Sequence, residues 1–143
     1  MAQSSRDPKL FTLEEANRLL PTVRGFLKSL RQRRDRVDKL EKEKAVEELS
    51  WLQEDGTVSP KAQDELIRLG ELQSQEIAAF EEELGKLADT GAQLKDLNEG
   101  LVDFFTARGG EIVYLCWKDG EDRILFWHDL ESGAAGRKPI EEL

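Results

Sequence analysis

The side chains that could do chemistry gather in the C-terminal part of the chain. Residues 100–140 hold the single Cys and the single His of the sequence, Cys116 and His128, together with the single Tyr and two of the three Trp residues. One Cys and one His are enough for a nucleophilic pair, in which the imidazole takes the proton of the thiol. One His beside carboxylates can instead form an acid–base pair or a metal site. We therefore expect any chemistry of this chain in residues 100–140.

The segment that positions these residues carries a β-hairpin signal. Residues 111–128 read EIVYLCWKDGEDRILFWH, and the Asp-Gly dipeptide at 119–120 is typical of a type I′ turn between two strands. This turn predicts a register that puts Cys116 on one face and pairs Glu111 with His128 on the other. Because successive side chains of a strand point to opposite faces, Cys116 and His128 are predicted to face apart. That register argues against a nucleophilic pair and favours a small buried Cys.

His128 remains a candidate for ligand binding. With Glu111 beside it and Asp103 within reach, it could belong to an acid–base pair or to a metal site with nitrogen and oxygen ligands. The simpler interpretation is an ordinary hydrogen-bonded His. Trp117 and Trp127 are interpreted as packing residues, with a ligand shelf as the alternative.

The tail adds a second group of candidates. Gly133, Gly136 and Arg137 form a Gly-x-x-Gly-Arg pattern, in which backbone amides and a guanidinium could bind a phosphate or carboxylate. The pattern lacks the strand and helix that flank a phosphate-binding loop. The candidate ligand-binding residues are Asp103, Trp117, Trp127, His128, Gly133, Gly136 and Arg137, and the candidate metal ligands are His128, Glu111 and Asp103.

The chain before residue 92 is predicted to be a helical hairpin. Thr12 and Glu15 match a capping box, and Ser59-Pro60 matches the start of a second helix. Apolar residues then recur at spacings of three and four in both segments. Pro21 predicts a kink or a short break in the first helix, because an interior proline removes an N–H and clashes with the preceding turn.

The two predicted helices carry opposite charge. Residues 24–44 contain nine basic and four acidic residues, a net charge of +5, and residues 64–89 contain eight acidic and two basic residues, a net charge of −6. Antiparallel pairing would bring the two together. The predicted fold is α+β and mostly α: a single domain, residues 1–143, with a long coiled-coil-like antiparallel hairpin over 10–91 and a small antiparallel β element and C-terminal loop over 92–143.

Composition limits the classes of function. The formal net charge is −9 and the sequence pI is about 4.8, which argues against a general nucleic-acid binder because phosphate contacts need a basic surface. One Cys excludes an intramolecular disulfide. No stretch has about 18 consecutive apolar residues, so we expect no membrane span and a cytoplasmic location. The basic run from Arg24 to Lys44 keeps RNA or ribosome association open, although a solvated helix face explains it more simply.

Three stretches carry a family resemblance: FTLEEANRLLP at 11–21, GLVDF at 100–104 and VYLCWKDGEDRILFWHDLESGAAGRKPI at 113–140. Together they resemble the bacterial proteins grouped as domain-of-unknown-function family 2203. The family pattern has Pro after GLVDF, where this chain has Phe105. Its Trp-His step falls on residues 127–128 and its Gly-Arg step on residues 136–137. The resemblance implies no established activity.

Three functions remain open from the sequence. The leading hypothesis is a non-enzymatic interaction or scaffold module, because no catalytic constellation is recognisable. Both faces of the predicted β-hairpin are apolar, so one can pack on the helices and the other needs the 101–104 segment, the C-terminal loop or another subunit as its cover. On this basis we expect a homo-oligomer, most simply a dimer. The second is a protein, possibly an enzyme, that binds a small molecule, an anion or a metal through Asp103, His128 and Arg137. The third is the RNA or ribosome association through Arg24 to Lys44; no cofactor is indicated.

Overall fold

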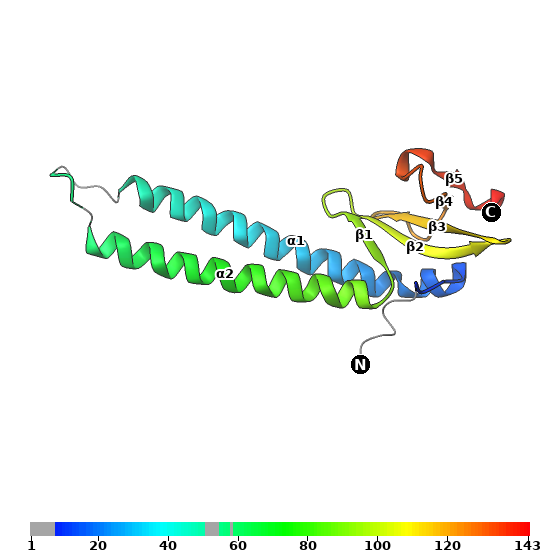
Figure 1. Ribbon diagram of the computed structural model, residues 1–143, viewed down its shortest axis with the longest axis horizontal. Coiled ribbons are helices and arrows are strands. Elements are labelled where there is room, and N and C mark those ends of the chain that lie inside the picture. Colours follow the sequence, from blue (N-terminus) through cyan, green and yellow to red (C-terminus); the bar gives the residue numbers. More distant parts are fainter. Residues whose placement is uncertain (1–7, 51–54, 58) are drawn as a thin grey trace. The chain divides into compact units, whose positions relative to one another are not determined.

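The computed structural model describes residues 8–50, 55–57 and 59–143. Two long helices precede a five-stranded antiparallel sheet, so the predicted class, α+β and mostly α, is confirmed (Figure 1). Among the described residues, no helix has both the length and the hydropathy that a membrane span requires. The elements are α1 (Leu13–Leu49), α2 (Pro60–Asp89), β1 (Gln93–Asp96), β2 (Leu101–Arg108), β3 (Glu111–Lys118), β4 (Phe126–His128) and β5 (Lys138–Pro139), with short 3-10 helices at Ala134–Gly136 and Ile140–Glu142.

The chain divides into two compact units. The hairpin unit is Ser29–Glu83, which holds the C-terminal part of α1 and most of α2. The sheet unit contains the residues up to Lys28 together with Leu84–Leu143, and so holds the sheet and the helix ends next to it.

Both helices start where the sequence predicts. The amide of Glu15 donates to Thr12 Oγ1 at 3.1 Å, and the amide of Thr12 donates to Glu15 Oε1 at 2.9 Å, which is the reciprocal pair of a capping box. Ser59 Oγ accepts from the amide of Ala62 at 3.4 Å at the start of α2. α1 is helical through Pro21, so the short break that the sequence allowed is absent.

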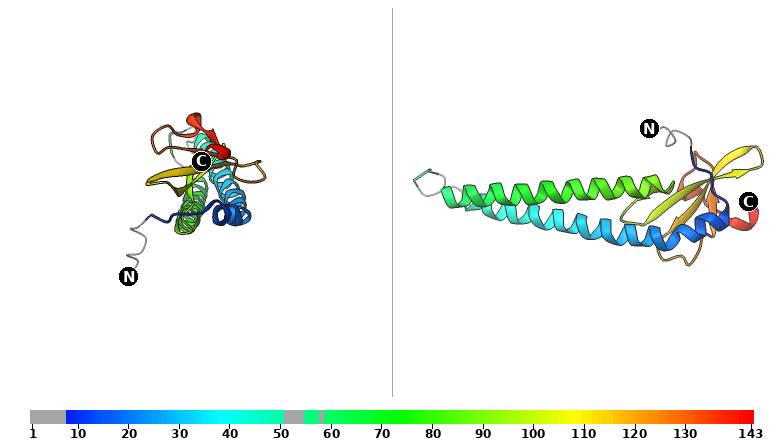
Figure 2. Two further views of the ribbon diagram at one scale, coloured as in Figure 1. Left: turned by 90° about the vertical axis from the view of Figure 1, so that its right-hand side faces the viewer. Right: turned by 90° about the horizontal axis from the view of Figure 1, so that it is seen from below.

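The hairpin unit pairs the predicted basic and acidic flanks. In Figure 2, α1 and α2 run side by side in opposite directions. Arg33 binds Glu76 at 2.9 Å and Glu83 at 3.1 Å, and Arg36 binds Glu76 at 3.0 Å. Ser29 Oγ donates to Glu83 at 2.7 Å. Part of the basic run thus binds the acids of α2, as the simpler interpretation of that run expects.

Glu76 makes the hairpin unit sensitive to acid. Burial raises the pKa of Glu76, but the hydrogen bonds from Arg33 and Arg36 outweigh it and hold the pKa below its usual value. A carboxyl group with a depressed folded-state pKa stabilises the fold above its unfolded-state pKa, about 4.3 for Glu, and the stabilisation is lost as the pH falls further. We expect protection from hydrogen exchange in 29–83 to drop below about pH 4.3. Glu76→Gln should flatten that dependence, whereas Glu71→Gln, at an exposed position, should leave it unchanged; equal slopes for both variants would contradict the prediction.

The sheet is a meander in which each strand pairs with the next along the chain. β2 continues through Phe105 to Arg108 and turns back through Gly109 into β3. In the β2–β3 pair Asp103 lies opposite Cys116, and in the β3–β4 pair Tyr114 lies opposite His128.

The predicted register of the second hairpin is wrong. Asp119 and Gly120 do form a turn, in which the amide of Glu121 donates to Lys118 O at 3.0 Å. Gly120 has a φ of 106°, but Asp119 does not have a positive φ, so the turn is not type I′. A negative φ at Asp119 also excludes type II′, and turns of types I and II splay the strands that they join. The return strand therefore begins at Phe126, five residues later than a tight hairpin requires.

The residues between the turn and β4 are diverted onto α1. Arg24 Nη2 donates to the carbonyls of Glu121 and Asp122, each at 3.2 Å. Asn17 Oδ1 accepts from the amide of Ile124 at 2.8 Å, and the Ile124 side chain is buried. Helix side chains about 100 residues earlier in the sequence thus satisfy the backbone of this segment, in place of a partner strand.

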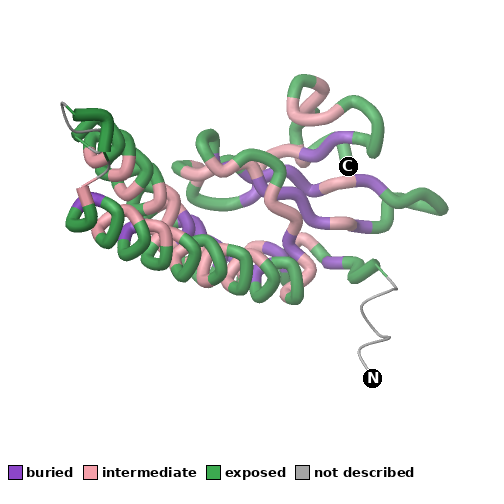
Figure 3. Tube along the Cα trace, turned by 60° about the vertical axis from the view of Figure 1, so that its left-hand side comes forward, coloured by how far each residue is buried: buried purple, intermediate pink, exposed green. Residues whose placement is uncertain are grey.

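One face of the sheet packs on helix ends and forms the core of the sheet unit. Figure 3 shows buried stretches along β2 and β3. The ring of Phe11 meets Phe104 edge to face at 5.2 Å, and Gly91 lies against it so closely that a Cβ would come within 2.9 Å of the ring. The buried apolar residues of this unit include Phe11, Ala16, Leu20, Val23, Leu27, Leu87, Val102, Phe104, Val113, Leu115, Trp117, Ile124 and Trp127.

Candidate functional site

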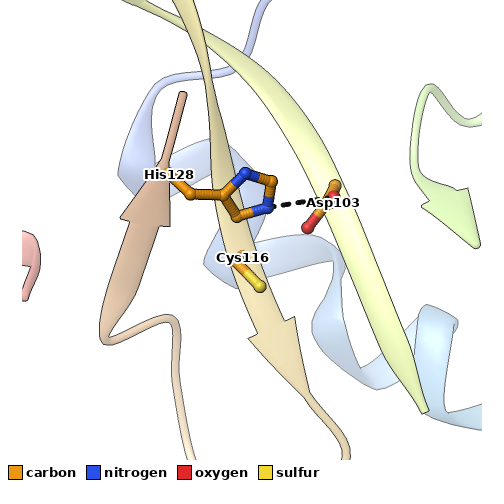
Figure 4. A group of neighbouring side chains, drawn as sticks. All are labelled: Asp103, Cys116 and His128. Carbon is orange, nitrogen blue, oxygen red and sulfur yellow. Dashed lines mark ion pairs between the residues drawn. The ribbon is translucent and has the colours of Figure 1, made fainter. Parts of the chain in front are cut away.

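Three adjacent strands each contribute one polar side chain to the other face of the sheet. Asp103 comes from β2, Cys116 from β3 and His128 from β4, and Figure 4 shows the three side chains turned toward one another. One ligand atom of each, a carboxylate oxygen, the thiol sulfur and an imidazole nitrogen, lies within 4.8 Å of the other two. A carboxylate, a thiol and an imidazole at this spacing are a potential set of metal ligands.

The observed register is what brings Cys116 and His128 together. Cys116 pairs with Phe126, whereas the predicted tight turn pairs it with Arg123, a shift of three residues. A shift by an odd number of residues moves every side chain of a strand to the opposite face. The prediction that Cys116 and His128 face apart is therefore wrong.

The cluster is buried and its polar atoms are incompletely paired. The side chains of His128 and Asp103 are 2% and 5% exposed. His128 Nε2 lies 3.2 Å from Asp103 Oδ2, but the direction of approach is not that of a hydrogen bond, and Nε2 and Asp103 Oδ1 are both without a hydrogen-bond partner. Buried polar groups are nearly always paired because an unpaired one carries a desolvation penalty. These two atoms are therefore available to a ligand.

The backbone fixes which nitrogen of His128 faces the cluster. His128 Nδ1 lies 2.7 Å from the carbonyl oxygen of Asp129. A carbonyl oxygen only accepts, so Nδ1 carries the proton of this hydrogen bond. In the neutral imidazole, Nε2 then presents its lone pair to Asp103 and Cys116. The same arrangement, with one ring N–H on a backbone carbonyl, orients metal-binding histidines.

Cys116 is a protonated thiol in this setting. Burial raises its pKa to about 12, the negative charge of Asp103 adds to the rise, and Arg137 offsets part of it. The side chain is fully buried. Reactive cysteines have lowered pKa values and partial exposure, so Cys116 does not have the properties of a nucleophile. A metal ion can still bind the thiolate, because coordination displaces the proton.

Arg137 lies next to Cys116 and binds its backbone carbonyl. Its Nη2 donates to Glu121 Oε1 at 2.8 Å, to Glu121 Oε2 at 3.0 Å and to the carbonyl of Cys116 at 3.3 Å. The guanidinium also lies over the ring of Phe126 at 4.1 Å. Arg137 is thus next to Cys116, as part of an ion pair with Glu121. Glu121 was not a candidate from the sequence, because the predicted turn made it a strand residue opposite Lys118.

Three other candidates from the sequence, Glu111, Trp117 and Trp127, lie away from the cluster. Glu111 is exposed at the start of β3 and pairs with Arg108, whereas His128 pairs with Tyr114, so the predicted pairing of Glu111 with His128 is wrong. Trp117 and Trp127 lie on the helix-facing side, opposite to Cys116 and His128, and both are buried. Trp117 Nε1 donates to the carbonyl of Glu121 at 2.8 Å. The packing interpretation of both Trp residues fits these positions.

The glycines of the tail have two different structural roles. Gly133 has a φ of 64°, which L-residues rarely adopt, and it lines a cavity over the cluster. Gly136 passes so close to Ser132 that a Cβ would come within 2.5 Å of the serine Cβ. These glycines shape the loop that covers this face, and Arg137 of the same pattern pairs with Glu121.

A cavity of about 290 Å³ opens over the cluster, and Asp103 and His128 form part of its wall. Loop residues after β4, including Leu130 and Glu131, close one side of it. β1 and β2 form another side. The residues that line it are Lys95, Asp96, Leu101, Asp103, Tyr114, His128, Leu130, Glu131, Gly133 and Ala134.

Comparison with known proteins identifies a family. The model of the family described as uncharacterized conserved protein (DUF2203) matches residues 9–140, nearly the whole chain. The chain belongs to the DUF2203 family. No curated protein and no solved structure matches it. Asp103, Cys116 and His128 all lie inside the matched range, so the DUF2203 match covers the whole cluster.

Proposed function

We propose that this DUF2203 protein binds one divalent transition-metal ion, with zinc the best match, through Asp103, Cys116 and His128. The observation that carries the proposal is the cluster of three buried ligand atoms within 4.8 Å of one another, two of them without a hydrogen-bond partner. The other contacts of the cluster support it. Nδ1 of His128 is already bound to a carbonyl, which leaves Nε2 as the ligand atom.

The chemistry of the donors favours zinc. One thiolate, one imidazole and one carboxylate form a borderline-soft set, whereas Mg²⁺ and Ca²⁺ prefer oxygen ligands alone. Zinc lies about 2.0–2.3 Å from such ligands, so tetrahedral ligands are about 3.6 Å apart. The three ligand atoms lie up to 4.8 Å apart, and side-chain movements of roughly 1 Å would bring them to the tetrahedral spacing.

The ligand count favours a site with an open position. Structural zinc sites have four protein ligands, whereas catalytic sites have three and leave the fourth position to water or substrate. Three candidate ligands are present here, and two of them line a cavity. This combination supports a site that exchanges an outside ligand, in agreement with the binding function that the sequence left open for Asp103 and His128.

Metal titration of chelator-treated protein tests the proposal. We expect one Zn²⁺ or Co²⁺ per chain by calorimetry and elemental analysis, and a thiolate-to-cobalt charge-transfer band in the near ultraviolet. Asp103→Asn, Cys116→Ser and His128→Gln should each weaken the affinity by more than about a hundredfold, because even partners outside the first coordination shell contribute up to that factor.

Glu111→Gln is the matched control. It removes the carboxylate that the sequence suggested as a ligand and that lies outside the cluster, so we expect the affinity to stay as in the wild type. Binding of cobalt without the thiolate-to-cobalt band, or cobalt binding that is unchanged in Cys116→Ser, would contradict the proposed ligand set.

A second candidate function is the interaction module, with the hairpin unit as its surface. Val46, Leu49 and Ile67 are exposed apolar residues on its two helices, and Leu49 is 86% exposed. Exposed apolar groups of this kind favour a protein contact, such as a second copy of the chain. Sedimentation at high concentration that gives the mass of one chain would argue against self-association.

A further inference from the structure

A lysine of β1 stands in the wall of the cavity. Gln93 lies opposite Asp103, so Gln93 and, two residues later, Lys95 point to the face of Asp103. A β-bulge follows, in which Asp96 rather than Lys95 lies opposite Leu101. Here the Lys95 side chain lies on the same face as Asp103 and His128, in the wall of the same cavity.

The Lys95 ammonium contacts Tyr114, whose ring lies next to His128 of the cluster. Its Nζ lies 3.3 Å from Tyr114 Oη and 4.7 Å from the centre of the Tyr114 ring. Tyr114 Oη in turn donates to Gln93 Oε1 at 3.0 Å, and its ring lies 5.3 Å from that of His128. An ammonium has three N–H donors. The contact with Tyr114 uses one of them.

Among the described residues that line the cavity, Lys95 is the one positive group, and the other charged side chains outside the cluster are Asp96 and Glu131. A divalent ion bound by the Asp103 carboxylate and the Cys116 thiolate is formally neutral. A monoanion on the open coordination position adds one negative charge, which Lys95 offsets. Asp96 and Glu131 bring the wall outside the cluster to a net charge of −1, so the ligand is limited to one negative group placed at Lys95, and a second negative charge is disfavoured.

The size and the remaining walls of the cavity define the rest of the ligand. Its volume of about 290 Å³ is at the lower end of small-molecule sites, which start at about 300 Å³. Leu101, Leu130 and Ala134 supply an apolar wall. A short carbon chain that ends in a carboxylate fits both the volume and the wall.

From these observations we infer that the metal centre takes a small organic carboxylate as an exchangeable ligand, with one oxygen on the open metal position and the other bound by Lys95. This inference rests on the proposed metal site. It adds the chemical class of the outside ligand and a specificity-determining residue, Lys95.

Titration of the cobalt-loaded protein with acetate, butyrate and phosphate at constant ionic strength tests the inference. Acetate and butyrate should change the visible d–d absorption of the cobalt, with butyrate the tighter ligand because of the apolar wall. Phosphate should bind more weakly, because a large fraction of it is a dianion at neutral pH. Lys95→Met should weaken carboxylate binding roughly tenfold to a hundredfold by removing a charge-assisted hydrogen bond. Lys61→Met removes the same charge from an exposed position on α2 and should change nothing.

The outcomes separate the two proposals. Cobalt binding with the thiolate band but without any response to carboxylates overturns the ligand inference and leaves the metal site standing. Tighter binding of phosphate than of butyrate overturns the carboxylate assignment, and equal binding by wild type and Lys95→Met overturns the role of Lys95. Failure to bind cobalt at all overturns both.

Discussion

Zinc at a free concentration 1,000-fold above its Kd is expected to raise the free energy of unfolding of the sheet unit by about 4 kcal/mol. The proposed ligands come from three strands, so an unfolded chain does not hold them together and the binding energy would stabilise the folded state. Urea unfolding followed by hydrogen exchange in β2 and β3, with and without zinc, measures the difference. Asp103→Asn should lose the zinc response.

The metal-free protein supplies a sharper form of this prediction. If Asp103 is a metal ligand without a satisfied partner, metal-free Asp103→Asn should be about as stable as the metal-free wild type, because the substitution removes a buried charge that lacks full pairing. If Asp103 and His128 instead form a structural ion pair, the same substitution should cost about 3–5 kcal/mol. A loss in that range would contradict the metal-site interpretation.

Trp117→Ala is expected to destabilise the sheet unit by about 3–5 kcal/mol, the range for truncation of large aromatic residues in a core. The indole is fully buried, and its Nε1 binds the carbonyl of Glu121 at 2.8 Å, which helps to hold the segment between β3 and β4. Arg24 lies 5.4 Å from the ring centre and binds the same carbonyl. Urea unfolding monitored by hydrogen exchange in β3 measures the loss.

Leu130→Ala is the control for this truncation. The Leu130 side chain is half exposed, so its loss should change the stability by no more than about 0.5 kcal/mol. A cost below about 1 kcal/mol for Trp117→Ala would mean that the indole is not part of the core. It would also reopen the ligand-shelf interpretation.

Local sequence signals account for the helices. Thr12 and Glu15 cap α1 as their spacing predicts, and Ser59 caps α2. These signals depend on neighbours within one turn of helix, so they can be recognised in the sequence without knowledge of the fold. The opposite charges of residues 24–44 and 64–89 can also be recognised in the sequence. In the structure, Arg33 and Arg36 of the first segment bind Glu76 of the second.

The candidate site could be predicted only in part. The sequence indicates His128, its single His, as a candidate ligand with Asp103 within reach, but it argues against Cys116 because the Asp-Gly turn predicts the wrong face. The run Ile124-Leu125-Phe126-Trp127 is apolar at every position, so it does not alternate and does not specify a register. The register follows from the bonds of Asn17 and Arg24 to residues 121–124. No local sequence signal predicts these contacts, because they join residues about 100 positions apart.

The separate strands of the three ligands also order events during folding. Asp103 and Cys116 lie on the β2–β3 hairpin, whose contacts are short in sequence, so we expect them to form early. We expect His128 to reach the cluster later, when residues 121–124 dock on α1. A metal ion meeting the chain before that step finds two ligands rather than three. The rate at which the thiolate-to-cobalt band appears during refolding should therefore report when the contact between residues 121–124 and α1 closes.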